Sequence, residues 1–202
     1  MTLPLGVILA GGLASRMGGG DKGLLSLGNG CVLDHVLYRL RPQVGKIALN
    51  ANGPPKRFSM FDLPILPDSV LGYPGPLAGV LAGLDWAAGK GAEQIITVAA
   101  DTPFFADDLT HVLSGACKIQ NMPIALAATQ GVAGCVFRHP TFGLWPVSLR
   151  HDLRAALELG MRKVIVWADK HGAAEAMFAT ACFDPFFNIN TLEDLKKAKA
   201  ML

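Results

Sequence analysis

A glycine-rich stretch near the N-terminus, GVILAGGLASRMGGGDKG, combines residue types that bind phosphate. Residues 6–23 contain seven glycines, together with Arg16 and Lys22, and begin within a short apolar run. Glycine lets the backbone approach an anion closely with its N–H groups turned inward. Arginine adds a bidentate fork and lysine a point charge. The stretch therefore predicts a site for a phosphate-containing ligand.

Two common phosphate-binding loops do not fit this stretch. The Walker loop requires G-x-x-x-x-G-K-[ST], and no lysine here stands in that frame. A G-x-G-x-x-G occurs at Gly18, Gly20 and Gly23, but it starts nine residues after Leu9. The dinucleotide fingerprint opens directly after its strand and is followed by an acidic residue about 20 positions later. The next predicted strand ends at Asn50 without an acid, so we interpret this match as chance.

Three further polar residues stand at the ends of apolar runs that are typical of buried strands: Asn50, Asp68 in LPDS and Asp101 in VAADTPFF. Ligands of open parallel sheets bind outside the carboxyl ends of the strands. Mg²⁺ prefers one or two carboxylates with phosphate oxygens and water, which suits Asp101. Each residue also has a purely structural interpretation in a turn or helix cap. Together they predict a nucleotide and metal site at one sheet edge.

The elements that position these residues alternate between strands and helices. Strands are predicted over Leu5–Leu9, Ile47–Asn50, Leu63–Leu66, Ile95–Ala99 and Ile124–Ala127. Helices are predicted over Val32–Leu40, Leu77–Ala88, Asp107–Leu113, Leu149–Leu159 and Lys163–Lys170, with a last helix starting at Thr191 and capped by Asp194. After Gly131 we expect shorter strands over 131–137, 141–147 and 174–181. This order predicts an α/β, Rossmann-like single domain with a largely parallel central sheet flanked by helices.

Composition excludes several classes of protein. The 202 residues carry a net charge of only +2 and are 51% hydrophobic, which suits one globular domain. The sequence has no long basic run of the kind that would indicate a nucleic-acid partner. The uncharged stretch over residues 69–84 is broken by Pro74 and Pro76 and is too short to cross a membrane. The four cysteines are widely spaced, which favours reduced thiols and a cytoplasmic location.

The sequence resembles the molybdenum cofactor guanylyltransferases over essentially its whole length. LAGGLASRMGGGDKGLL matches the N-terminal signature of that family, and later blocks follow in the same order: LPDSVLGYPGPLAGVLAGL, AADTPFF, FGLWPVSL and FFNINTLEDL. The first elements are shared with the wider nucleotidyltransferase superfamily, whose fold is that of nucleotide-diphospho-sugar transferases. The later blocks are the ones that narrow the resemblance to this family.

The resemblance implies a Mg²⁺-dependent enzyme that transfers GMP from GTP to molybdopterin and releases pyrophosphate. It implies one nucleotidyltransferase domain over residues 1–202, with a nucleotide-binding half over about 1–130 and a pterin-binding half over about 131–202. Other molybdenum cofactor biosynthesis proteins and recipient molybdoenzymes or their chaperones are the implied protein partners. The implied GTP contacts are Leu9, Ala10, Gly11, Gly12, Lys22, Asn50, Asp68 and Asp101, with Asp101 also binding the metal.

The same resemblance implies pterin contacts at Asn188 and Asn190, and contacts with the pterin phosphate at Arg162 and Lys163. Arg16 and Lys22 would stabilise the leaving pyrophosphate, and with Asp101 they form the expected catalytic set. Two alternatives from the same fold stay open: a CTP-dependent sister enzyme acting on the same pterin, and a sugar or alditol-phosphate nucleotidyltransferase. A non-catalytic nucleotide-binding module is the alternative from another class.

Overall fold

The computed structural model describes residues 3–11, 21–70, 75–131, 134–180 and 183–202. Within these ranges the chain forms a seven-stranded sheet in the order β5-β4-β1-β6-β8-β7-β9. The strands are β1 Leu5–Leu9, β4 Ile47–Asn50, β5 Ile65–Leu66, β6 Gln94–Ala99, β7 Ile124–Gln130, β8 Val136–Pro146 and β9 Ala173–Phe178. Only β8 runs antiparallel to its neighbours, so the predicted largely parallel sheet is confirmed.

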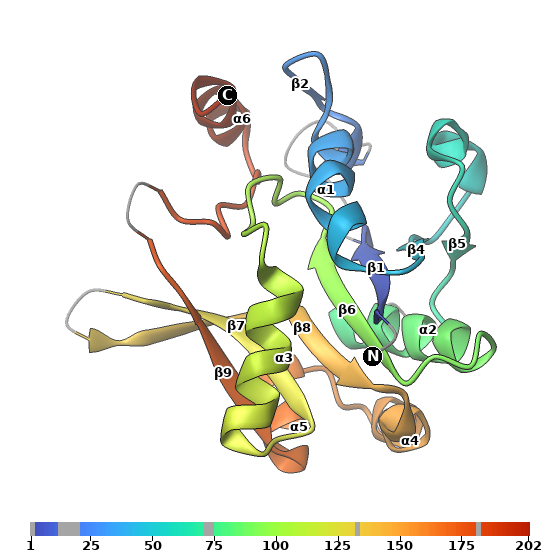
Figure 1. Cartoon of the computed structure of the whole chain (residues 1–202). Coiled ribbons are helices and arrows are strands. Elements are labelled where there is room, and N and C mark those ends of the chain that lie inside the picture. Colours follow the sequence, from blue (N-terminus) through green and yellow to red (C-terminus); the bar gives the residue numbers. More distant parts are fainter. Residues whose placement is uncertain (1–2, 12–20, 71–74, 132–133, 181–182) are drawn as a thin grey trace.

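Helices cover both faces of this sheet (Figure 1). They are α1 Val32–Leu40, α2 Pro76–Ala88, α3 Leu109–Gln120, α4 Arg150–Glu158, α5 Val164–His171 and α6 Leu192–Ala200. Neighbouring strand residues pack on opposite sides, as the two-residue period of a strand requires. Val7 and Ile95 contact the cluster of α2, α4 and α5, whereas Ile8 and Ile96 contact the cluster of α1 and α3. None of the helices in the described part of the chain has the length and apolar character needed to cross a membrane.

Helix α2 packs unusually close to the sheet because two glycines face it. A Cβ atom on Gly83 would lie 2.7 Å from Val7 Cγ2. A Cβ atom on Gly79 would lie too close to the Asn50 side-chain oxygen and 2.8 Å from Leu9 Cδ2. Atoms this close would have to move apart. The glycines therefore let α2 lie directly against the ends of β1 and β4, where the predicted site residues stand.

The first half of the chain follows the sequence prediction closely. β1, β4 and α1 have the predicted bounds, and α2 and β6 each begin one residue earlier than predicted. α3 begins two residues later than predicted and runs further, to Gln120, and its buried face extends to Ala116, beyond the predicted end at Leu113. Several short elements were not predicted, among them the hairpin of β2 Ser26–Leu27 with β3 Gly30–Cys31 and the 3-10 segment Pro55–Phe61.

The second half corrects one prediction. The strands expected over 131–137 and 141–147 are a single strand, β8, whose residues Val136–Pro146 include His139 and Pro140 between the two apolar runs. Proline usually interrupts a strand because it lacks an N–H for the ladder. Here β8 accommodates Pro140 with an irregularity in its pairing to β7. The expected strand over 174–181 is β9, which covers Ala173–Phe178.

The last helix begins as predicted. Thr191 is the N-cap of α6, and its side chain accepts a hydrogen bond from the Asp194 backbone N–H at 3.1 Å. Asp194 in turn accepts from the backbone N–H of Thr191 at 2.9 Å. These hydrogen bonds, first among them the one with Thr191, hold the pKa of Asp194 below its ordinary value. The capping box thus fixes the start of α6, directly after the NINT sequence.

Candidate active site

A cavity of about 310 Å³ opens at the carboxyl edge of the sheet. Its walls come from the ends of β1, β4 and β6, from the start of α2, from β8 and from the segment before α6. The lining residues are Leu9, Gly11, Asn50, Asp68, Gly75, Pro76, Ala99, Asp101, Thr141 and Asn188. Residues predicted for the site from distant parts of the sequence therefore meet in one place.

The cavity exists because β8 leaves β6 before β6 ends. The two strands pair as far as Thr97 and Gly143, while β6 continues to Ala99. Figure 1 shows β6 rising toward α1 while the β7–β8 hairpin turns away from it. The sheet is thus split at its carboxyl edge. Ala99 on one side of the split and Thr141 on the other both line the cavity.

The irregularity in β8 sets where this split begins. The β7 neighbours Leu126 and Ala127 pair with Gly143 and His139 respectively, so the residues between those two partners have no matching position on β7. Pro140 lies in this extra segment. A bulge of this kind bends a strand and re-aims its side chains. The bulge therefore turns β8 away from β6 next to the cavity.

The segment after β9 returns across the split and joins the two sides. Phe186 is buried, stacks on His139 with ring centroids 4.2 Å apart, and meets Phe142 edge-on at 4.8 Å. Three residues later, the Ile189 backbone N–H donates to the Asp101 carbonyl at 2.9 Å. Asn188 and Asn190, on either side of Ile189, are thereby held next to Asp101.

Lys22 and Asp101 form the charged centre of the site. Lys22 Nζ lies 3.1 Å from Asp101 Oδ2, and the two side chains are only 18% and 19% exposed. The same ammonium donates a hydrogen bond to Asn190 Oδ1. Partial burial strengthens such charged contacts relative to those in open water. The glycine-rich stretch, the end of β6 and the NINT segment therefore meet at one ammonium group.

Asn50 and Asp68 form a second polar group on the side of β4 and β5. Asn50 is 3% exposed, and its amide donates to the Leu66 carbonyl at 3.0 Å and to Asp68 Oδ1 at 2.9 Å. Asn52 donates to Asp68 Oδ2 at 2.7 Å and accepts from the Asp68 backbone N–H at 2.9 Å. Both oxygens of the Asp68 carboxylate are thus held by amides, which fixes this wall of the cavity.

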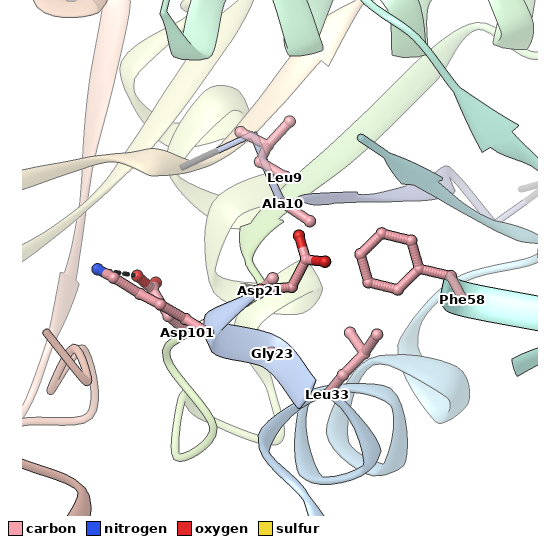
Figure 2. Close-up of a pocket in the computed structure, with 9 residues that line it drawn as sticks. Leu9, Ala10, Asp21, Gly23, Leu33, Phe58 and Asp101 are labelled. Carbon is pink, nitrogen blue, oxygen red and sulfur yellow. Dashed lines mark hydrogen bonds and ion pairs between the residues drawn. The ribbon is translucent and has the colours of Figure 1, made fainter. Parts of the chain in front are cut away.

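A smaller cavity of about 30 Å³ lies beside the charged centre. Figure 2 shows its residues, with the Asp21 carboxylate between Ala10 and the Phe58 ring. Asp21 Oδ2 lies 2.6 Å from Arg57 Nε, in an ion pair whose side chains are 17% and 28% exposed. Arg57 also donates to the carbonyls of Asn52 and Pro54. The residue next to Lys22 is thereby tied to the segment that follows β4.

Comparison with known proteins identifies the family. Residues 6–174 match the MobA-like NTP transferase domain. The chain is 48% identical to the molybdenum cofactor guanylyltransferase of Mesorhizobium japonicum, covering 98% of this chain and 95% of that protein. It is 47% identical to that of a Bradyrhizobium strain over 97% and 92% of the two chains. The chain belongs to the molybdenum cofactor guanylyltransferase family.

Solved structures agree on the fold of this family member. Molybdopterin-guanine dinucleotide biosynthesis protein A from Archaeoglobus fulgidus superposes with a TM-score of 0.74 at 21% identity, covering 98% of this chain and 97% of that one. A CMP:2-keto-3-deoxy-manno-octonic acid synthetase solved with CTP superposes with a TM-score of 0.72 at 12% identity, over 99% and 98%. The predicted nucleotidyltransferase fold is confirmed.

Most of the predicted site residues lie together in this guanylyltransferase family member. The two cavities bring together Leu9, Ala10, Gly11, Lys22, Asn50, Asp68, Asp101 and Asn188, and Asn190 contacts Lys22. Arg16 and Gly12 fall outside the described residues. Arg162 and Lys163 lie elsewhere, in the connection between α4 and α5, at the end of the sheet away from α6 (Figure 1). The Arg162 guanidinium donates there to the carbonyls of Leu157 and Met161, at 2.9 and 2.8 Å.

The sequence prediction missed four residues of the site: Asp21, Asn52, Arg57 and Thr141. Asp21 stands next to Lys22 in the glycine-rich stretch, so its position was an available signal. Nothing in the local sequence distinguishes Asn52 or Arg57, because their roles depend on contacts with distant residues. Thr141 lies in the part of β8 that has no matching position on β7, a feature of strand pairing that the local sequence does not show.

Asp101 offers a carboxylate suited to a hard cation. Among the described residues, no group of three or more His, Cys, Asp or Glu side chains gathers in one place. Carboxylates without a cluster of His or Cys ligands suit Mg²⁺ better than zinc, because Mg²⁺ is commonly bound by one or two carboxylates together with substrate phosphates and water. Asp101 borders both cavities, so a cation there would lie next to whatever anion the cavities hold.

Proposed function

We propose that this protein transfers GMP from GTP to molybdopterin, giving the guanine dinucleotide form of the cofactor and pyrophosphate. The observation that carries this proposal is the meeting of Lys22, Asp101 and Asn190 at the edge of a cavity lined by both halves of the chain. The strong similarity to molybdenum cofactor guanylyltransferases supports it.

In this proposal GTP lies on the side of β1, β4 and β5. Leu9, Gly11, Asn50 and Asp68 line the cavity on this side. The backbone from Leu9 to Gly12, of which Gly12 lies outside the described residues, would approach the nucleotide, and Asn50 and Asp68 would contact its nucleoside part. The amides around Asp68 hold that carboxylate in one orientation, so it needs little reorganisation to accept hydrogen bonds from the ligand. Lys22 and Asp101 then lie beside the triphosphate.

The reaction joins two anions, so the site has to reduce their repulsion. A terminal phosphate oxygen of molybdopterin forms a bond to the α-phosphorus of GTP. The bond between that phosphorus and the oxygen bridging the α- and β-phosphates breaks, and pyrophosphate leaves with the bonding electron pair. Lys22 and Arg16 stabilise the charge on the leaving group. Asp101 would hold Mg²⁺, which when bound would supply Lewis-acid stabilisation of the phosphate oxygens. The attacking phosphate is already ionised at neutral pH, so the chemistry needs no general base.

Molybdopterin then lies on the side of residues 131–202, with Asn188 and Asn190 as contacts. Asn190 accepts a hydrogen bond from Lys22, which connects this half to the nucleotide half over residues 1–130. Arg162 and Lys163 remain predicted contacts for the pterin phosphate. Arg162 and Lys163 lie between α4 and α5, so they can contact the acceptor only if it extends beyond the cavity.

The proposal includes a cytoplasmic location and exchange of pterin with other proteins of cofactor biosynthesis and with recipient molybdoenzymes or their chaperones. Pull-down of such proteins with the purified chain tests the partners. Cell fractionation tests the location.

One experiment tests the reaction itself. Pyrophosphate release is measured with GTP or CTP, each with and without molybdopterin and Mg²⁺. We expect release only with GTP, molybdopterin and metal together. Equal turnover of CTP would favour the cytidylyl-transferring alternative, and release with a sugar phosphate in place of molybdopterin would overturn the assignment of the acceptor.

A further inference from the structure

Resting on the proposed function, we infer that Thr141 is a specificity-determining residue that hydrogen-bonds the heterocyclic part of the acceptor substrate. Neither the sequence pattern nor the family resemblance singled out this residue. Thr141 belongs to β8, a strand that lies outside the parallel nucleotide-binding part of the sheet, yet it lines the same cavity as Asn50, Asp68 and Asp101.

The order of strands places Thr141 on the acceptor side. Asn50 ends β4, and β1 and β6 lie between that strand and β8. Paired strands are about 4.8 Å apart, so where the ladder is intact β8 lies roughly 14 Å from β4, and beyond Gly143, where β8 no longer pairs with β6, Thr141 lies on the far side of the split from Asn50. Asp101, which follows β6, lies between them. A nucleotide whose nucleoside contacts Asn50 and whose phosphates reach Asp101 therefore leaves the Thr141 side for the second substrate.

The local backbone presents Thr141 to the cavity. The β8 ladder to β6 ends at Gly143, and the pairing to β7 skips the residues between Gly143 and His139. Phe142 is buried beneath this segment against Phe186, whereas Thr141 is partly exposed. Within the described part of the chain, no side chain or backbone group hydrogen-bonds the Thr141 hydroxyl. The hydroxyl is thus available to a ligand.

The chemistry of this wall favours a heterocycle over a phosphate. Thr141 and Asn188 are both uncharged, and each offers a donor and an acceptor. The charged groups lie at Lys22 and Asp101 instead. An edge with amide-like N–H and C=O groups, as in a pterin ring, matches such a neutral pair, whereas a phosphate is bound more strongly by cations.

The test compares Thr141→Ser, Thr141→Ala and Thr141→Val, with Thr180→Val as a matched control at an exposed threonine outside the cavity. Initial rates of pyrophosphate release give separate KM values for molybdopterin and GTP. We expect Thr141→Ala and Thr141→Val to raise the KM for molybdopterin about tenfold, with the KM for GTP within twofold of the unsubstituted protein. Thr141→Ser and Thr180→Val should keep both values.

Other outcomes overturn the inference. An unchanged KM for molybdopterin in Thr141→Ala would show that Thr141 does not contact the acceptor. A raised KM for GTP alone would show that it contacts the nucleotide instead. A loss in Thr141→Ser equal to that in Thr141→Ala would show that shape, not the hydroxyl, matters. Should Thr141→Val fail to fold, the Ser and Ala pair alone decides. An inactive unsubstituted protein would contradict the proposed function, and calorimetric titration with GTP would show whether its nucleotide site is intact.

Discussion

The two sides of the sheet are built differently although they border one cavity. On the side of β5, β4, β1 and β6 all neighbouring strands are parallel, and the site residues stand at or just after strand ends. On the side of β8, β7 and β9 the sheet is mixed, and Thr141 lies inside a strand at a bulge. The parallel side thus presents its polar groups from strand ends, whereas the mixed side contributes an uncharged hydroxyl from within a bulged strand.

Substitution of Asp101 should give the largest effect. We expect Asp101→Ala to lower kcat for pyrophosphate release about a thousandfold, because the metal ligand is lost from the parallel side. Asp101→Asn serves as the control for side-chain shape, and circular dichroism checks the fold. Activity retained in Asp101→Ala would show that the metal binds elsewhere. It would also contradict the assignment of the metal to the parallel side of the sheet.

Lys22→Ala should reduce kcat about a hundredfold, since it removes a cation that stabilises the leaving group. It also leaves the Asp101 carboxylate and the Asn190 amide without their common donor. Lys22→Arg keeps the charge and should recover part of the loss. Asn190→Ala should affect the molybdopterin KM more than kcat. Unchanged kinetics in Lys22→Ala would refute the role on the pyrophosphate.

Gly79→Ala tests how far the nucleotide side depends on close packing of α2. The added methyl would displace Asn50 or Leu9, which we expect to cost about 2 kcal/mol of unfolding free energy and to raise the KM for GTP. Gly115→Ala, where the added methyl meets nothing within 4 Å, is the matched control and should stabilise α3 slightly. Urea unfolding and GTP titration measure both effects, and equal stability of the two variants would contradict the packing argument.

The smallest effect should come from His139 on the mixed side. Burial lowers its pKa below the ordinary 6.5, and Asp184 opposes this shift. The folded protein therefore binds this proton less readily than the unfolded chain. The contribution of neutral His139 to the free energy of unfolding is fully present above pH 6.5. It is lost as the pH falls below 6.5 toward the folded-state pKa. Urea midpoints at pH 7.5 and 5.5 should differ less in His139→Gln than in the unsubstituted protein. The KM for GTP should be the same in His139→Gln and in the unsubstituted protein.

The same contrast explains what could be predicted from sequence. β1 and β4 were predicted to the residue because strands buried on both faces give short, continuous apolar runs with clear ends. The bounds of α1 were predicted because its buried residues recur at the three- and four-residue spacing of one helix face. β8 was predicted as two strands because Pro140 is a strong local break, and only pairing with both β6 and β7 keeps the strand whole. Arg57 and Thr141 were missed for a related reason, since their roles arise from tertiary contacts that leave no local pattern.

The contact between Lys22 and Asn190 spans 168 positions of the chain, and β9 is already complete at Phe178. During synthesis on the ribosome, every strand of the large sheet therefore emerges before the residues that join the two substrate sides. The hydrogen bond that joins the nucleotide side to the acceptor side is therefore among the last contacts of the site that the growing chain can make.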